Sequence, residues 1–395
     1  MHLFEPARHE PLDAPPWSEA RVDAAIAQIV ERTLAALDSE HGWPSHPSDQ
    51  DSAPAPDASL YFGTAGVVWA LAELGTTPPH GDELLANAAR ASDAAAATEP
   101  GDYRRGLLLT GTGALAVASL LTGEPSDELL VRTRANSTNP VLEFMWGAPG
   151  TMLAANALFE RTGESRWADA FLASARELER MLVTSTTGAR LWNQHLYGHH
   201  GMHLGAVHGF AGNLAPIVAG AKRLSATELA RWEELAVKTI TATALRDGAL
   251  ANWAPSIDGG RPGREKLLVQ TCHGAPGIVA VLAHFAHDVD REFDALLESG
   301  GELTWHAGPL TKGAGLCHGT AGNGYALLAL FERTRDEKWL DRARAFAMHA
   351  LVQSERAARE HGALRYSLWT GDLGVALYLR ACRTLDSRFP SLVYL

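Results

Sequence analysis

The stretch "GLCHGTAGNG", Gly315–Gly324, contains a Gly-x-x-Gly phrase that recurs along the chain. Six copies are intact, with their first glycines at positions 63, 147, 209, 274, 319 and 371, and we interpret Gly111–Ala114 as a degenerate seventh copy. The first and last copies are 308 residues apart, which gives a mean spacing of about 51 residues, in the range of known repeat architectures. The sequence is therefore built from seven related units.

Each copy is followed by a short apolar run, such as "VVWALAEL" after Gly66 or "NGYALLALF" after Gly322. Longer amphipathic stretches, such as "DEKWLDRARAFAMHALVQSERAARE", separate these runs. A helix that is apolar all round is suited to burial, whereas an amphipathic helix keeps one face in water. The repeating unit is then a glycine turn, an inner helix, a loop and an outer helix. Seven such units predict an all-α fold, an α/α toroid with seven inner and seven outer helices.

A closed toroid needs an outer helix that the last repeat does not supply. The stretch "SEARVDAAIAQIVERTLAALDSE", residues 18–40, is amphipathic and is predicted to be this helix. Ser18 is a suitable N-cap, although Arg21 three residues later does not complete a capping box. Residues 41–58 are rich in proline and serine and are predicted to be a connector. Because no linker divides the repeats, we expect residues 1–395 to form one toroidal domain.

The composition restricts the possible partners and compartment. Hydrophobic residues make up 46% of the 395-residue chain and the formal net charge is −12, as expected of a globular protein that does not bind nucleic acid or anionic membranes. No apolar run approaches the roughly 18–20 residues of a membrane span. The start, "MHLFEPARHEPLDAPP", has no apolar stretch of signal-peptide type. We therefore expect a cytoplasmic protein without a membrane span.

Two of the three cysteines occur in the same phrase, as Cys272–His273 and Cys317–His318. In a toroid, equivalent positions of successive repeats lie side by side at the rim that the inner helices enter, so these residues should converge. Two thiolates and one imidazole form a good zinc site, and three protein ligands leave the open position of catalytic zinc. Such an ion can hold a further thiol as a thiolate. Cys382, in "LYLRACRT", is predicted to be a buried structural cysteine.

Other interpretations of these residues stay open at this point. The cysteines could be small core residues of similar repeats, or two ligands of a closed, four-ligand structural zinc site. A different toroidal enzyme, such as a glycosidase or a prenyltransferase-like zinc enzyme, is also possible. A glycosidase needs two carboxylates, for which the glycine rim offers Glu143 and Asp372, but neither explains the cysteines.

The phrases "GLCHGTAGNGYALL", "TCHGAPG" and "GAVHGFAG" closely resemble the lanthionine synthetase C-like family, and the resemblance runs from about residue 59 to 379. It implies an α/α toroid and zinc-dependent addition of a thiol to dehydroalanine or dehydrobutyrine, with formation of a lanthionine-type thioether. The bacterial cyclases use a cysteine of the precursor peptide, and eukaryotic members use glutathione. The implied partners are thus a peptide or protein carrying a dehydroamino acid and a thiol, either a peptide cysteine or glutathione. The alternative is a zinc-containing protein that binds glutathione or peptide with little catalytic activity.

The resemblance also assigns roles to individual residues. It implies one zinc ion per chain, held by Cys272, Cys317 and His318, with His273 lining the substrate site beside the metal. The implied catalytic residues, which follow from "GAVHGFAG", "VLEFMWGAPG" and "LTKGAGLCHG", are His208, Glu143 and Lys312. His208 or Glu143 would act as the proton donor, and Lys312 would stabilise an enolate oxygen or bind a substrate carboxylate. Glu143 and Lys312 resemble the glutathione-binding branch more than the peptide cyclases.

Three features depart from the family pattern. Thr271 precedes the first cysteine, where the family usually has tryptophan, and the last turn reads Thr370-Gly371-Asp372 in place of Glu-Gly-Met. The stretch "WNQHLYGHHGMHLGAVHG" is unusually rich in histidine. We expect its additional histidines to be surface or rim residues and not metal ligands; they are His195, His199, His200 and His203.

Overall fold

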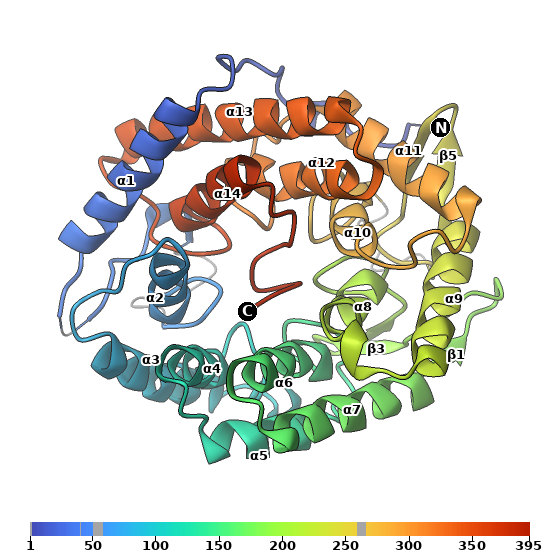
Figure 1. The fold of residues 1–395 in the computed structure, drawn as a ribbon, viewed down its shortest axis with the longest axis horizontal. Helices are drawn as coiled ribbons and strands as arrows, with labels where there is room; N and C mark the ends of the chain where they lie inside the picture. The colour runs from blue at the N-terminus through green and yellow to red at the C-terminus, as the bar shows by residue number, and fades with distance from the viewer. Residues whose placement is uncertain (1, 40, 50–57, 259–265) are drawn as a thin grey trace.

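The computed structural model describes residues 2–39, 41–49, 58–258 and 266–395, and these residues contain fourteen α-helices. The inner helices are α2 (Thr64–Glu73), α4 (Gly111–Thr122), α6 (Ala148–Thr162), α8 (Phe210–Ala219), α10 (Ala275–Leu282), α12 (Thr320–Thr334) and α14 (Asp372–Thr384). The outer helices are α1 (Glu19–Ala35), α3 (Gly81–Ala96), α5 (Asp127–Asn136), α7 (Ser165–Arg180), α9 (Ala226–Thr243), α11 (Arg291–Ala307) and α13 (Glu337–His361). The predicted toroid of seven inner and seven outer helices is confirmed (Figure 1).

The inner helices form a closed ring. Each contacts the next inner helix along the chain, and α14 contacts α2. Burial separates the two layers, because α12 buries every residue from Thr320 to Phe331 whereas α1 buries four residues on one face. None of the helices in the described ranges is both long and apolar enough to cross a membrane.

Helix α1 packs against α14 and lies in the outer layer (Figure 1). It ends at Ala35, earlier than the predicted boundary at residue 40. The side chain of Ser18 accepts a hydrogen bond from the backbone N–H of Arg21, which is the expected simple N-cap. The indole of Trp43 then donates to the backbone oxygen of Thr33, so the chain turns back onto the helix after its end.

Close backbone packing explains the repeated glycines. A Cβ atom on Gly322 would lie 1.7 Å from the carbonyl oxygen of Leu316, six residues earlier, and one on Gly113 would lie 2.4 Å from that of Leu107. The same relation holds at the second glycine of all seven turns. Only glycine lets the chain pass this close to its own backbone.

The contact between the second glycine of a turn and the carbonyl oxygen six residues earlier also corrects the alignment of the degenerate turn with the other copies. Thr110, and not Gly111, is the N-cap that corresponds to the first glycine of the other turns, and Gly113 corresponds to the second. The hydroxyl of Thr110 accepts a hydrogen bond from the N–H of Thr112, so a capping side chain stands where the other repeats have glycine.

Backbone hydrogen bonds join neighbouring turns into one rim. The N–H of Tyr61 donates to Leu108, and the N–H of Trp369 donates to Tyr61, which links the first turn to the second and the last. Further along the ring, Phe144 donates to Val207. The N-termini of the inner helices therefore lie side by side, with their positive dipole ends at this rim.

The described ranges also contain three short antiparallel hairpins that were not predicted from the sequence. They pair β1 (Val183–Thr184) with β2 (Arg190–Leu191), β3 (Gln194–Leu196) with β4 (His199–Gly201), and β5 (Leu245–Asp247) with β6 (Leu250–Asn252). The β3–β4 hairpin accounts for much of the histidine-rich stretch, because His195 pairs with His200 and the two rings stack with centroids 4.7 Å apart.

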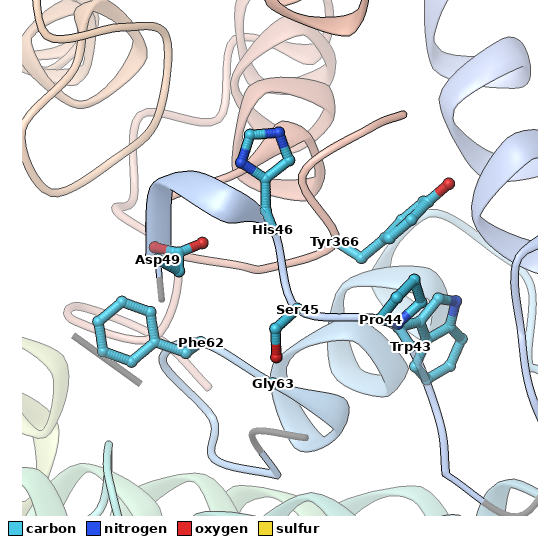
Figure 2. A pocket seen from close by; sticks show the side chains of 8 residues that line it. All are labelled: Trp43, Pro44, Ser45, His46, Asp49, Phe62, Gly63 and Tyr366. Carbon is cyan, nitrogen blue, oxygen red and sulfur yellow. The ribbon is translucent and has the colours of Figure 1, made fainter. Parts of the chain in front are cut away.

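The segments at both ends of the chain contact the rim. In the connector, Trp43, His46 and Asp49 lie beside Phe62 and Gly63 of the first turn, as Figure 2 shows; residues 50–57 lie outside the described ranges. After α14, the C-terminal segment runs toward the centre of the ring in Figure 1. There the buried hydroxyl of Ser391 accepts a hydrogen bond from the indole of Trp369.

Candidate metal centre

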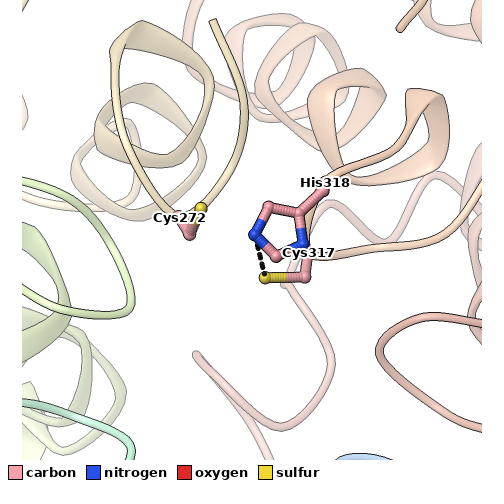
Figure 3. Close-up of side chains that lie close together, drawn as sticks. All are labelled: Cys272, Cys317 and His318. Carbon is pink, nitrogen blue, oxygen red and sulfur yellow. Dashed lines mark hydrogen bonds between the residues drawn. The ribbon is translucent and has the colours of Figure 1, made fainter. Parts of the chain in front are cut away.

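The two Cys-His phrases converge at the rim. Cys272 precedes α10, and Cys317 and His318 precede α12, the next inner helix (Figure 3). One sulfur or nitrogen atom from each of these three residues lies within 4.8 Å of the other two. Both cysteines are 2% exposed. Two thiols and an imidazole at this spacing fit one zinc ion, which binds at about 2.3 Å from sulfur and about 2.0 Å from nitrogen.

The two buried thiols influence each other's ionisation. Burial by itself would raise the pKa of Cys272, but the hydrogen bond with Cys317 and the nearby His318 lower it well below the ordinary thiol value. Burial and the neighbouring Cys272 raise the pKa of Cys317. The hydroxyl of Tyr61, which is itself buried, donates a hydrogen bond to Cys317. Cys272 thus ionises first, and a dication that binds both sulfurs would displace the proton of Cys317.

His273 and His318 both directly follow a cysteine, but their side chains are placed differently, because the backbone differs at the glycine that comes next. Gly274 has φ = 105°, in the region that favours glycine, whereas Gly319 is extended with φ = −131°. The ring of His273 lies 5.8 Å from the ring of His208, and His273 is not part of the three-residue cluster. Burial lowers the pKa of His273 to about 4, so this side chain is neutral at physiological pH.

Glu143 and His208 form a hydrogen-bonded pair beside the cluster. His208 donates from Nδ1 to Oε2 of Glu143 over 3.0 Å, and the carboxylate also accepts the backbone N–H groups of Met145 and Trp146. Burial alone would lower the pKa of His208, but the bond to Glu143 and the negative charges of Glu143 and Cys272 raise it. Because Nδ1 is held by the carboxylate, Nε2 is the nitrogen that can face a substrate.

A cavity of about 280 Å³ opens beside the cluster. It is lined by Tyr61, His318, Lys312 and Arg365, among others. Lys312 is exposed and forms no ion pair within the described residues. Arg365, by contrast, is ion-paired with Asp49 of the connector. Within the described residues, Lys312 is therefore the lining cation of this cavity that is not paired with a carboxylate.

A comparison of the sequence with known families gives a match over nearly the whole chain. Residues 19–393 match the family described as lanthionine synthetase C-like protein. The chain belongs to this family. Within it, a 130-residue segment is 38% identical to glutathione S-transferase LANCL1 of Danio rerio and covers 32% of this chain and 31% of that protein. A 137-residue segment is 39% identical to LanC-like protein GCL1 of Arabidopsis thaliana and covers 32% of this chain and 30% of the relative. These matches thus span less than a third of either relative.

A solved structure supports the fold over a longer range. Nisin cyclase superimposes with a TM-score of 0.57 over 95% of this chain and 97% of its own, at 15% sequence identity. At that identity the likeness shows the shared toroid alone. Of the two sequence relatives, the Danio rerio protein carries glutathione in its name, and the name of the Arabidopsis thaliana protein gives the LanC-like family alone.

The structure explains two departures from the family pattern. Thr271 is fully buried, and its hydroxyl oxygen would lie 2.4 Å from a Cβ on Gly322, so this small side chain fills the space between two turns. Asp372 accepts hydrogen bonds from the hydroxyl of Ser354 and from the backbone N–H of Arg365. Asp372 therefore holds the Arg365 segment in place and is not paired with Glu143 as two glycosidase carboxylates would be.

Sequence reasoning missed several residues that contact the cluster or its cavity, among them Tyr61, Gln270 and Arg365. Tyr61 donates to Cys317, Arg365 lines the cavity, and Gln270 donates from its amide to Cys272. Gln270 stands two residues before the cysteine, and this proximity was the one available signal. Of the additional histidines, His199 and His200 are exposed, whereas His195 and His203 are partly buried; within the described residues none of the four belongs to the three-residue cluster.

Proposed function

We propose that this protein catalyses the zinc-dependent addition of glutathione to dehydroalanine or dehydrobutyrine residues of a peptide or protein, forming a lanthionine-type thioether. The observation that carries the proposal is the cluster of Cys272, Cys317 and His318 beside a compact cavity, which is lined by His318 and by the exposed, cationic Lys312. A cysteine of a large peptide would not need a cationic group here, whereas a small thiol with carboxylates would.

The donor set supports a catalytic metal over a structural one. Within the described residues, no fourth histidine, cysteine or carboxylate joins the three-residue cluster, so one coordination position would stay open. Zinc bound by these residues would lower the pKa of an incoming thiol and hold it as a thiolate at neutral pH.

The remaining chemistry falls to the side chains around the cluster. Addition joins the thiol sulfur to the β-carbon of the dehydroamino acid, and the α-carbon then takes up a proton. His208 is the proton donor that the geometry favours, because Glu143 raises its pKa and leaves Nε2 toward the substrate. The buried carboxylate of Glu143 accepts hydrogen bonds from the N–H groups of Met145 and Trp146 and from His208. Its role is therefore to position His208. Neutral His273 lines the same side of the site.

Lys312 is placed to bind a carboxylate of the thiol substrate. It lines the cavity beside His318, and its charge also acts on Cys317. Binding of the carboxylate at Lys312 would hold the thiol end of glutathione near the cluster and account for selectivity toward an anionic thiol.

A competition between two nucleophiles tests the proposal. Zinc-loaded protein is incubated with glutathione and with two dehydroalanine peptides, one with an internal cysteine and one without. Mass spectrometry should detect the glutathione adduct on both peptides, and His208→Gln should slow its formation about 100-fold or more while keeping the zinc. Cyclisation of the cysteine peptide without any glutathione adduct would show a peptide cyclase instead. Zinc binding without a thioether product in either case would show a binding protein.

A further inference from the structure

The two sulfur atoms of the cluster have different hydrogen-bond donors. Nε2 of Gln270 lies 2.9 Å from Sγ of Cys272, and the Gln270 side chain is 4% exposed. Cys317 is approached instead by the hydroxyl of Tyr61 and by Nε2 of His318, which lies 3.6 Å from its Sγ (Figure 3). A hydrogen-bond donor withdraws part of the negative charge of a thiolate. The amide of Gln270 therefore lowers the electron density on the sulfur of Cys272 and not on that of Cys317.

The orientation of the Gln270 amide is fixed by Arg8, which is 262 residues away in the sequence. Nη2 of Arg8 donates to Oε1 of Gln270 over 3.0 Å. A guanidinium group has donors and no acceptor, so it can face only the oxygen of the amide. The nitrogen of the amide must then point the other way, toward Cys272. Without Arg8, the amide could turn its oxygen toward the sulfur, where two electron-rich atoms would repel each other.

The N-terminal segment is anchored so that Arg8 reaches this position. The backbone oxygen of Arg8 accepts hydrogen bonds from the N–H and the hydroxyl of Thr311, at 3.0 and 3.1 Å. His9 contacts the backbone oxygen of Gly308 through Nδ1, and the N–H of Glu10 donates to Pro309. Residues 8–10 thus lie along residues 308–311, just before the turn that carries Cys317.

The turn that carries Cys272 is equally well fixed. The backbone N–H and oxygen of Gln270 are both bonded to those of His273, at 3.2 and 3.1 Å. This closed pair of bonds holds the Gln270 side chain above Cys272. The N-terminal segment therefore connects both cysteine turns, one through the side chain of Arg8 and the other through its backbone.

We infer that Arg8 is a positioning residue of the metal centre, which acts through Gln270 to place an N–H donor on the sulfur of Cys272. The inference rests on the proposed zinc site and adds to it a role for the N-terminal segment in setting the electronic character of one of its two thiolates. It predicts that a change at Arg8 alters the metal site although Arg8 contacts no ligand directly.

Cobalt substitution tests this inference without an activity assay. Cobalt(II) bound through thiolates gives a sulfur-to-metal charge-transfer band, which moves to longer wavelength when a hydrogen bond to sulfur is removed. Arg8→Leu and Gln270→Leu should each move the band in this direction and weaken zinc binding about 10-fold, measured by competition with a chelator. The double variant should show the shift of one single variant, because both act on the same bond.

Arg356→Leu is the matched control. Arg356 pairs with Glu10 in the same N-terminal segment but has no contact with Gln270. It should leave the band and the zinc affinity unchanged. An Arg8→Leu protein that binds cobalt with the wild-type band and affinity would overturn the role of Arg8 alone. A wild-type protein without any thiolate-to-cobalt band would overturn the metal centre itself, so the two failures can be told apart.

Discussion

Nδ1 of His208 lies 3.0 Å from Oε2 of the fully buried Glu143. The same carboxylate is held by the N–H groups of Met145 and Trp146, so it cannot turn away from the imidazole. The pair fixes one tautomer of His208 and keeps its pKa above the ordinary value. These two consequences of one contact can be separated by experiment.

Substitution of the carboxylate should move the pH dependence of the reaction. Protonated His208 is the proposed acid, so activity should fall as pH rises through its raised pKa. Glu143→Gln removes the negative charge, lowers the pKa of His208 and should shift this alkaline limb to lower pH. The pH profile of kcat/KM measures the shift, and an unchanged profile would show that His208 is not the titrating acid.

Removal of one cluster cysteine should remove the metal. Cys317→Ala leaves two ligands and should bind much less than one zinc per chain, as measured by atomic absorption after dialysis. Cys382→Ala is the control, because Cys382 is fully buried in α14, where burial raises its pKa to about 12. It should keep its zinc. Equal zinc content in both variants would argue against the cluster as the binding site.

Neutralisation of Lys312 should act on substrate binding more than on the chemical step. Lys312→Met is expected to raise KM for glutathione about 10-fold or more, with a smaller effect on kcat, because a charged hydrogen bond to a carboxylate is lost. The KM for a thiol without a carboxylate should change little. Lys238→Met, on the outer helix α9 and paired with Glu234, provides the surface control. A similar KM increase for both thiols would exclude a carboxylate contact.

The glycine turns should tolerate no side chain at their second glycine. Gly322→Ala would place Cβ against the carbonyl oxygen of Leu316, and we expect a loss of unfolding free energy of about 1–3 kcal/mol or more. Gly101→Ala has no neighbouring atom within 4 Å and should have little effect. Thermal unfolding compares the two, and a stable Gly322→Ala protein would contradict the steric explanation of the repeat.

Much of the fold could be predicted from the sequence, because the repeat carries both its turn and its inner helix in one local phrase. The convergence of Cys272 with Cys317 also followed, since equivalent positions of neighbouring repeats are adjacent in a closed ring. The turn at Thr110 was placed one residue too late, because a capping threonine replaces the glycine that marks the other copies.

The parts that could not be predicted depend on contacts between distant segments. Arg8 and Gln270 are 262 residues apart, and Arg365 meets Asp49 from 316 residues away. One member of each pair, Arg8 or Asp49, lies outside the repeats, so no periodic pattern indicates the contact. The N-terminal segment reads as a polar, proline-rich stretch, and its role at the rim depends on backbone pairing with Thr311 that leaves no mark in composition.

Zinc dependence of glutathione addition tests the central claim most directly. The protein is stripped with a chelator under reducing conditions, and adduct formation on a cysteine-free dehydroalanine peptide is followed by mass spectrometry before and after zinc is restored. We predict that addition stops in the stripped protein and returns with one equivalent of zinc in the wild type, but not in Cys317→Ala. Addition at the same rate by stripped and zinc-loaded protein would contradict the proposed function.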